Sequence, residues 1–286
     1  MISKRMPAGR RNFDRFFSVL GMISIGIGIL LLIIVIVGAV KDGIHMVSPD
    51  FLTRRLSPTR PDRTGVLTPM IGSAYIVGLT ILLSVPIGIA AAIYLEELTR
   101  PSRMREFIQA NVSNLAGVPS IIYGILGLAL FVRAFQLGQT VIAAALTMSL
   151  LVLPTVILVT REALRMVPKA YREGSIALGA TPWQTLFGQI LPVAFPNIIT
   201  GIILSASRAI GESAPLMVIG AATYMRKPPN GLFDGFTVLP IQIYYWSSDS
   251  RRGFVEVASA AIFVLMVALL ALNFFAMFLR GRARRV

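Results

Sequence analysis

The sequence predicts an all-α membrane protein that crosses the bilayer six times and keeps both termini in the cytoplasm. Hydrophobic residues make up 55% of its 286 residues and charged residues only 14%. A soluble domain carries roughly 25% charged residues, and this chain contains repeated apolar runs long enough to span a membrane. Helices are expected because an α-helix satisfies its own backbone hydrogen bonds inside lipid.

The composition also excludes several functional classes. The net charge of +14 would suggest a nucleic-acid partner for a soluble protein. Here the basic residues lie in tails and loops between apolar runs, where topology and contact with the lipid bilayer explain them, so no nucleic-acid partner is expected. The chain has no cysteine and one histidine, His45, in a polar loop. We therefore expect no disulfide and no metal site.

Six apolar runs have the roughly 20 residues that a transmembrane helix needs. They cover residues 16–40, 71–95, 115–135, 140–160, 195–222 and 257–279. The first run is too long for the apolar part of a cleavable signal peptide, and no small-residue cleavage site follows it. Prolines inside the later runs predict kinked helices that line a cavity. These prolines are Pro86, Pro119, Pro154 and Pro215.

The distribution of basic residues orients the six runs. An even number of crossings places both tails on one side, and both tails are basic. Their basic residues are Lys4, Arg5, Arg10, Arg11, Arg15, Arg280, Arg282, Arg284 and Arg285. The positive-inside rule therefore places the tails in the cytoplasm, together with segments 96–114 and 161–194. Segments 41–70 and 223–256 become external loops.

Segment 161–194 carries signals of ordered structure. Gly179 suits the cap at the C-terminal end of a helix, and Thr181 followed by Pro182 is a typical helix start. The pattern predicts a helix, a glycine turn and a short second helix. Such a rigid element would serve as a docking surface for another protein. The alternative is an amphipathic helix that lies at the membrane interface.

Two charged residues, Arg208 and Glu212, lie deep in the predicted fifth span. They are four residues apart, so on a helix they share one face and interact. Charges at that depth are costly, and they normally face the interior of a bundle or a wet path. Two interpretations stay open: a site for anion transit or gating, and an internal salt bridge that orients helices.

Segment 161–194 resembles the EAA loop of ABC importer permeases. The resemblance rests on Glu173, the Leu-Gly-Ala at 178–180 and the Leu-Pro at 191–192, although Glu-Gly-Ser replaces the frequent Glu-Ala-Ala. It implies the fold of a type I ABC importer permease, whose coupling helix docks in a groove of an ATPase subunit, here at 181–187. The residues that it assigns to this coupling are Glu173, Gly179, Ala180, Thr181, Pro182, Trp183 and Phe187.

A second resemblance concerns the substrate. The segments RAIGESAP at 208–215, GVPSIIYG at 117–124 and LPIQIY at 239–244 are similar to those of phosphate ABC importer permeases of the PstA type. This implies a phosphate pathway that includes Arg208 and Glu212. It also implies a paralogous permease of the PstC type, two ATPase subunits of the PstB type and an external phosphate-binding protein of the PstS type, assembled in a bacterial plasma membrane.

The sequence lacks the phosphate-binding pattern G-x-x-x-x-G-K-[ST] of an ATPase. We therefore expect a permease subunit that is not itself an enzyme and has no cofactor, with ATP and magnesium bound by the partner ATPase subunits. The expected organisation is a tail, first helix and external loop over 1–70, a permease domain over 71–275 and a basic tail over 276–286.

Two other functions stay open from the sequence. A permease for another oxyanion, such as molybdate or sulfate, would carry the same docking loop. A stand-alone channel or secondary transporter would not need that loop, and the chain shows no obvious inverted repeat of broken helices.

Overall fold

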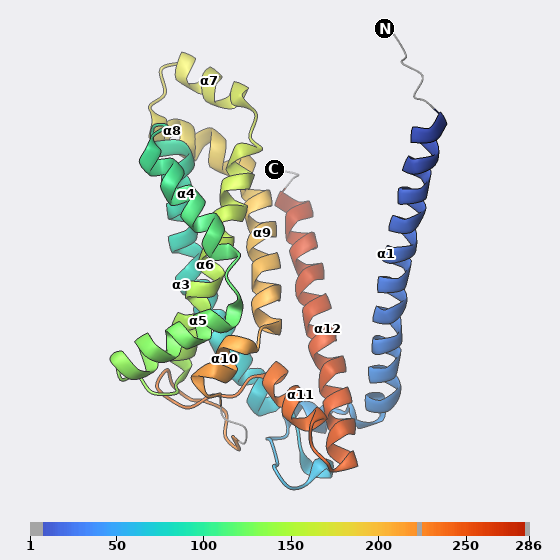
Figure 1. The fold of residues 1–286 in the computed structure, drawn as a ribbon. Coiled ribbons are helices and arrows are strands. Elements are labelled where there is room, and N and C mark those ends of the chain that lie inside the picture. Colours follow the sequence, from blue (N-terminus) through green and yellow to red (C-terminus); the bar gives the residue numbers. More distant parts are fainter. Residues whose placement is uncertain (1–7, 222–224, 284–286) are drawn as a thin grey trace.

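The computed structural model describes residues 8–221 and 225–283, and every regular element in these ranges is a helix (Figure 1). The predicted all-α class is therefore confirmed. Several residues that entered the topology prediction lie outside the described ranges. They are the tail residues Lys4, Arg5, Arg284 and Arg285, and the boundary residues Ala222 and Thr223.

Five helical segments of the described chain are long and apolar enough to cross a membrane. Their main helices are α1 (Ala8–Gly43), α3 (Leu67–Ile93), α6 (Val141–Arg165), α9 (Leu191–Gly211) and α12 (Arg252–Ala283). They correspond to five of the six predicted spans. Prolines inside α3 and α6 do not end these helices, because neighbouring groups can satisfy the backbone that a proline frees.

The remaining predicted crossing is a bent pair of helices. α4 (Arg103–Ala116) meets α5 (Ser120–Gly127) and its π-helical continuation η4 (Leu128–Ala134) at 97°. Pro119 explains the break, because proline lacks a backbone N–H and drives the preceding residue out of helical conformation. Counting this pair as one span gives six crossings. Segment 96–114, expected only as a cytoplasmic connection between two spans, is mostly α4.

The predicted fifth span, residues 195–222, is also divided. α9 ends at Gly211, and the short helix α10 (Ala214–Ile219) begins after a break at Glu212 and Ser213. Two of the six predicted spans are therefore interrupted inside the bundle. The two interruptions lie near each other, because α10 packs directly against α5.

The two ends of the bundle differ in structure (Figure 1). At one end, α7 (Lys169–Ala177) lies beside α8 (Pro182–Thr185) and the π-helical turn η5 (Leu186–Ile190). α8 and η5 run into α9 as one helical segment. The second helix of the docking segment is thus the start of the fifth span, not a separate short helix. At the other end, α2 (Pro49–Thr53) and α11 (Leu239–Ser247) pack in one hydrophobic cluster.

Close helix contacts hold the bundle together. A Cβ at Gly88 in α3 would lie 2.6 Å from a side-chain carbon of Val156 in α6, so glycine permits this approach. α1 stands at the edge of the molecule and contacts α12 near one end (Figure 1). There, a Cβ at Gly43 would lie 2.7 Å from Cα of Ala260. Most apolar side chains of α1 are exposed, so lipid or another membrane subunit must cover them.

The described course of the chain agrees with an even number of crossings. α1 begins and α12 ends at the same end of the bundle as α7 (Figure 1). By the positive-inside rule this is the cytoplasmic end.

Cysteine labelling tests this topology cleanly, because the natural chain has no cysteine. Ala177 in α7 and Ser248 after α11 are both exposed and lie at opposite ends of the bundle. In intact cells, an impermeant thiol reagent should label Ser248→Cys, whereas Ala177→Cys should react only after the membrane is permeabilised. Labelling of Ala177→Cys from outside would contradict the cytoplasmic placement of α7.

Candidate functional site

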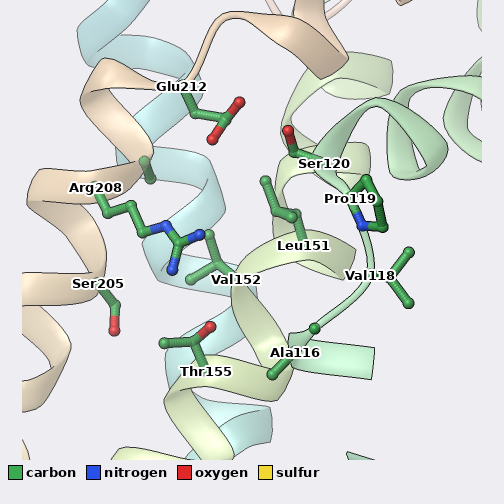
Figure 2. Close-up of a pocket in the computed structure, with 12 residues that line it drawn as sticks. Ala116, Val118, Pro119, Ser120, Leu151, Val152, Thr155, Ser205, Arg208 and Glu212 are labelled. Carbon is green, nitrogen blue, oxygen red and sulfur yellow. The ribbon is translucent and has the colours of Figure 1, made fainter. Parts of the chain in front are cut away.

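A cavity of about 240 Å³ lies between the two interrupted spans. Its walls are the bend at residues 116–120, the middle of α6 and the end of α9 (Figure 2). One water molecule needs roughly 10–15 Å³ of cavity volume. The cavity therefore has room for a small anion together with several water molecules.

The cavity lies at the middle depth of the bundle. Its floor includes Thr155 of α6, a helix of 25 residues. At 1.5 Å per residue, Leu151, which also lines the cavity, is roughly 14–15 Å from each end of the apolar part of that helix (residues 141–160), whereas Thr155 lies nearer its cytoplasmic end. The hydrocarbon core of a bilayer is about 30 Å thick, so the cavity sits near its centre.

Arg208 and Glu212 point into this cavity from the end of α9 (Figure 2). Arg208 lies in the last turn, and Glu212 follows the helix with φ −82° and ψ 117°. The expectation that both residues share one helix face is therefore corrected, because Glu212 is not helical. Among the described residues, neither side chain forms an ion pair. The internal salt bridge, one of the two interpretations that the sequence left open, is therefore not formed between Arg208 and Glu212 in the described chain.

The cavity also presents polar groups that suit an oxyanion. Ser120 and Thr155 place hydroxyl groups in its wall opposite Arg208 (Figure 2). Ser120 is the first residue of α5, and the start of a helix is the positive end of its dipole, although the Ile122 N–H already donates to the Pro119 carbonyl oxygen at 3.0 Å. Ser205 contributes less, because its hydroxyl already donates to the Gly201 carbonyl oxygen at 2.9 Å.

The exposure of Arg208 bears on the environment of the cavity. Arg208 is exposed in the single chain, and Glu212 is half-buried. A charged group at the centre of a membrane is costly unless it meets water or protein. The open side of the cavity must therefore face a wet path or a second membrane subunit. The arrangement supplies one positive charge and several donors to a small anion at mid-membrane.

The predicted docking segment forms one ordered unit at the cytoplasmic end. The hydroxyl groups of Ser175 in α7 and Thr185 in α8 share a hydrogen bond of 2.9 Å. Beneath them, Leu186 and Ile190 are buried in a hydrophobic cluster with Leu164 of α6. The segment is thus fastened to the transmembrane bundle at its base.

The turn of this segment follows the sequence prediction. Gly179 has φ +85°, a conformation that glycine adopts without steric cost. The Thr181 hydroxyl accepts a hydrogen bond from the Gln184 backbone N–H at 3.3 Å, and the Gln184 side chain accepts one from the Thr181 N–H at 2.8 Å. This reciprocal capping box, with Pro182 in the first turn, starts the helix.

The outer face of the docking segment carries exposed apolar side chains. The rings of Trp183 and Phe187 stack with their centroids 5.9 Å apart, and both are exposed. Leu178, at the turn, is 91% exposed. Glu173 is exposed on α7, and Ala180 is half-buried in the turn. The stacked rings of Trp183 and Phe187 thus form an exposed apolar patch at this end of the bundle, and such patches typically mark protein interfaces.

The structure separates the predicted site residues into two groups. The docking residues gather around α7 and α8, whereas Arg208 and Glu212 lie at the far end of α9 (Figure 1, Figure 2). Sequence reasoning missed a third feature, an ion-pair cluster between these groups. Its centre is Glu96 in η3 (Tyr94–Leu98), whose side chain is only 6% exposed. Its arginine partners are Arg105, Arg161 and Arg165.

A neighbouring carboxylate extends this cluster to the docking segment. Glu97 accepts hydrogen bonds from Arg172 of α7, one of them from Nε at 3.1 Å. These hydrogen bonds raise the pKa of Arg172 above its ordinary value. The available sequence signal was the adjacent pair Glu96 and Glu97 at the end of one apolar run. Arg161 and Arg165, four residues apart, lie at the end of another.

Comparisons with known proteins identify related sequences and a related fold. The family described as "Binding-protein-dependent transport system inner membrane component" matches residues 84–285, which include the cavity and the docking segment. Phosphate transport system permease protein PstA 1 of Mycobacterium tuberculosis is 34% identical over 223 residues, covering 77% of this chain and 72% of that protein. The PstA protein of Haemophilus influenzae is 29% identical over 266 residues, 93% of each chain.

A solved structure has a similar fold. The MetNI methionine ABC transporter in inward-facing conformations aligns with a TM-score of 0.59 and 21% identity, covering 77% of this chain and 95% of that chain.

The positive φ of Gly179 predicts a local effect of substitution. A Cβ there would meet no atom within 4 Å, so the penalty of Gly179→Val is backbone strain of roughly 1–2 kcal/mol. That destabilisation should increase opening of the segment roughly 5–30-fold. The measurement is the initial rate of trypsin cleavage after Lys169 and Arg172 in purified protein.

Two matched variants control this test. Gly174→Ala changes an exposed helical glycine with open space around it and no positive φ, so the cleavage rate should not rise. Gly179→Asn should behave like the parent, because asparagine tolerates this conformation. Equal cleavage of Gly179→Val and the parent would show that the turn does not hold the segment in place.

Proposed function

The chain belongs to the family of binding-protein-dependent transport system inner membrane components, and from this premise we propose that it is a PstA-type transmembrane subunit of an ATP-driven phosphate importer. It forms half of the translocation pathway and transmits work from separate ATPase subunits. The observation that carries the proposal is Arg208 at mid-membrane, without an ion-pair partner among the described residues, in a cavity lined also by hydroxyl groups and by the first residue of α5.

The charge of Arg208 suits the passage of phosphate. Phosphate is a mono- or dianion near neutral pH, and an anion in the membrane centre needs positive compensation. At about 4 Å and an effective dielectric constant near 20, one charge pair contributes about 4 kcal/mol before desolvation. Glu212 in the same cavity limits how strongly the anion is held, because its negative charge opposes retention. Together the two residues favour transit over permanent binding.

The docking segment provides the second half of the mechanism. Its exposed apolar patch around Trp183 and Phe187 lies on α8 and η5, which continue into α9 as one helical segment. The other end of α9 carries Arg208, and the base of the docking segment packs against α6. We therefore assign this patch to contact with an ATPase subunit of the PstB type. ATP and magnesium bind to that partner, and this chain supplies no catalytic group.

The open side of the cavity and the exposed α1 call for a further membrane partner. A paralogous permease of the PstC type would cover Arg208 and complete the pathway. A phosphate-binding protein of the PstS type would dock at the external end formed by α2 and α11. The assembly would lie in a bacterial plasma membrane, as a multi-pass complex.

Phosphate uptake by the reconstituted complex tests this function. The chain is purified with its own partner permease, ATPase subunits and binding protein, and placed in proteoliposomes. Arg208→Gln should lower ATP-driven phosphate uptake by at least about 100-fold, since removal of roughly 4 kcal/mol of charge compensation raises the barrier. Arg208→Lys keeps the charge and should retain part of the uptake.

Three outcomes of this experiment are informative. Normal uptake by Arg208→Gln would contradict a transit role for the residue. Loss of assembly in both variants would show that Arg208 is structural. Competition by sulfate or molybdate as strong as that by phosphate itself would favour a permease for another oxyanion.

A further inference from the structure

The ion-pair cluster around Glu96 is not used by the transport pathway or by the docking surface. The Glu96 carboxylate accepts from Nε of Arg161 at 2.6 Å and from Nε of Arg165 at 3.0 Å, both in α6. Its third partner is the only one from α4: Arg105, whose Nη2 lies 3.1 Å away. Arg105 also donates to the Thr99 carbonyl oxygen at 3.2 Å. Glu96 thus ties the start of α4 to α3 and α6.

The same turn of chain also holds α7, the first helix of the docking segment. Glu97, next to Glu96, binds Arg172 of α7, and Arg172 further donates to the Leu164 carbonyl oxygen at 3.1 Å. The π-helical turn η3 therefore joins α7 on one side and α4 on the other. A shift of α7 acts on Glu97, and through the shared turn on Glu96 and Arg105.

α4 is built to pass such a shift to the cavity. Arg105 lies in its first turn, and Ala116 at its last residue lines the cavity, roughly 17 Å away along the helix axis. None of the 14 residues of α4, all of them described, is buried. The ion pair of Arg105 therefore fixes the start of α4, while Val112 in its second half packs against the buried cluster of Ala92, Leu95 and Ile157.

We propose that the ion pair between Glu96 and Arg105 is a positioning link that carries movement of α7, the first helix of the docking segment, to the bend beside Arg208. This inference rests on the proposed function. Arg105 touches no substrate, and its role is to make α4 follow η3 when the ATPase subunits move α7. Contiguous contacts of this kind can carry coupling between distant sites, and the ion pair of Arg105 joins the start of α4 to η3.

The coupling ratio distinguishes this role from a merely structural one. In the reconstituted complex, phosphate imported and ATP hydrolysed are measured together. Arg105→Gln removes the link of α4 but leaves Glu96 paired with two arginines, so the carboxylate stays compensated and the protein folds. The ratio of phosphate to ATP should fall about five-fold or more, while binding of the ATPase subunits is unchanged.

Two matched arginines of the chain serve as controls. Arg165→Gln removes a half-exposed partner of the same carboxylate, but Arg161 still holds α6, so the ratio should stay at the parent value. Arg103→Gln removes a charge from the first turn of α4 that forms no ion pair among the described residues, and it should also have no effect. A parent-like ratio in Arg105→Gln would overturn the proposal, and so would an equal fall in all three variants.

A second measurement does not depend on the substrate. Spin labels on cysteines at Asn114 of α4 and Leu204 of α9, both exposed, report the distance across the bend with and without ATP. The parent and Arg103→Gln should show an ATP-dependent change that Arg105→Gln lacks. A change retained in Arg105→Gln, or absent from the parent, would overturn the link. Failure of the parent to import phosphate would instead refute the proposed function.

If Arg105→Gln fails to assemble, Arg105→Lys replaces it in both measurements. Lysine keeps the charge but loses the planar fork that reaches Glu96 and Thr99 together. An intermediate ratio would support the link, and a parent-like ratio with a parent-like distance change would overturn it.

Discussion

Inside hydrocarbon, every backbone N–H and C=O group must find a partner, and an interrupted helix survives only where protein or water covers the break. This chain interrupts two of its crossings, at Pro119 and at Glu212, and brings the two interruptions together. The constraint forces the region between them to be polar, hydrated or covered by protein. The cavity, and the need for a wet path or a second membrane subunit beside the exposed Arg208, follow from it.

The cavity and the proposed docking surface lie far apart, so any coupling between them requires structural connections through the bundle. The docking surface is fastened to α6 by buried apolar contacts and is continuous with α9. A second connection passes through η3 to α4. Both interrupted spans that line the cavity are therefore connected to the cytoplasmic end. α9 is connected as one continuous helical segment, and α4 is connected through the ion pair between Arg105 and Glu96. Movement at one end can thus change the shape of the cavity.

The sequence predicted the crossings well because the apolar content of a span depends on its residues alone. The breaks were harder to predict. Pro86, Pro119 and Pro154 occur in runs of similar composition, yet only Pro119 accompanies a sharp bend. Whether a proline interrupts a helix depends on neighbours that satisfy the freed backbone groups. Those neighbours come from other parts of the chain.

The candidate site shows the same division between local and distant information. The turn at Gly179 and the cap at Thr181 were predictable, because each is set by a few adjacent residues. The placement of Arg208 at a mid-membrane cavity depended on where α9 ends. The cluster around Glu96 was missed, because its carboxylate and Arg161 are 65 positions apart, and only the packing of α3 on α6 unites them.

The position of phosphate inside the assembled transporter is the most direct test of transit through the cavity at Arg208. The structure of the complete complex, arrested during ATP hydrolysis with phosphate held in the membrane, provides that measurement. Phosphate should lie in contact with the Arg208 guanidinium, between the start of α5 and the end of α9. Phosphate on a path lined by other residues, with Arg208 paired to a protein carboxylate, would contradict it.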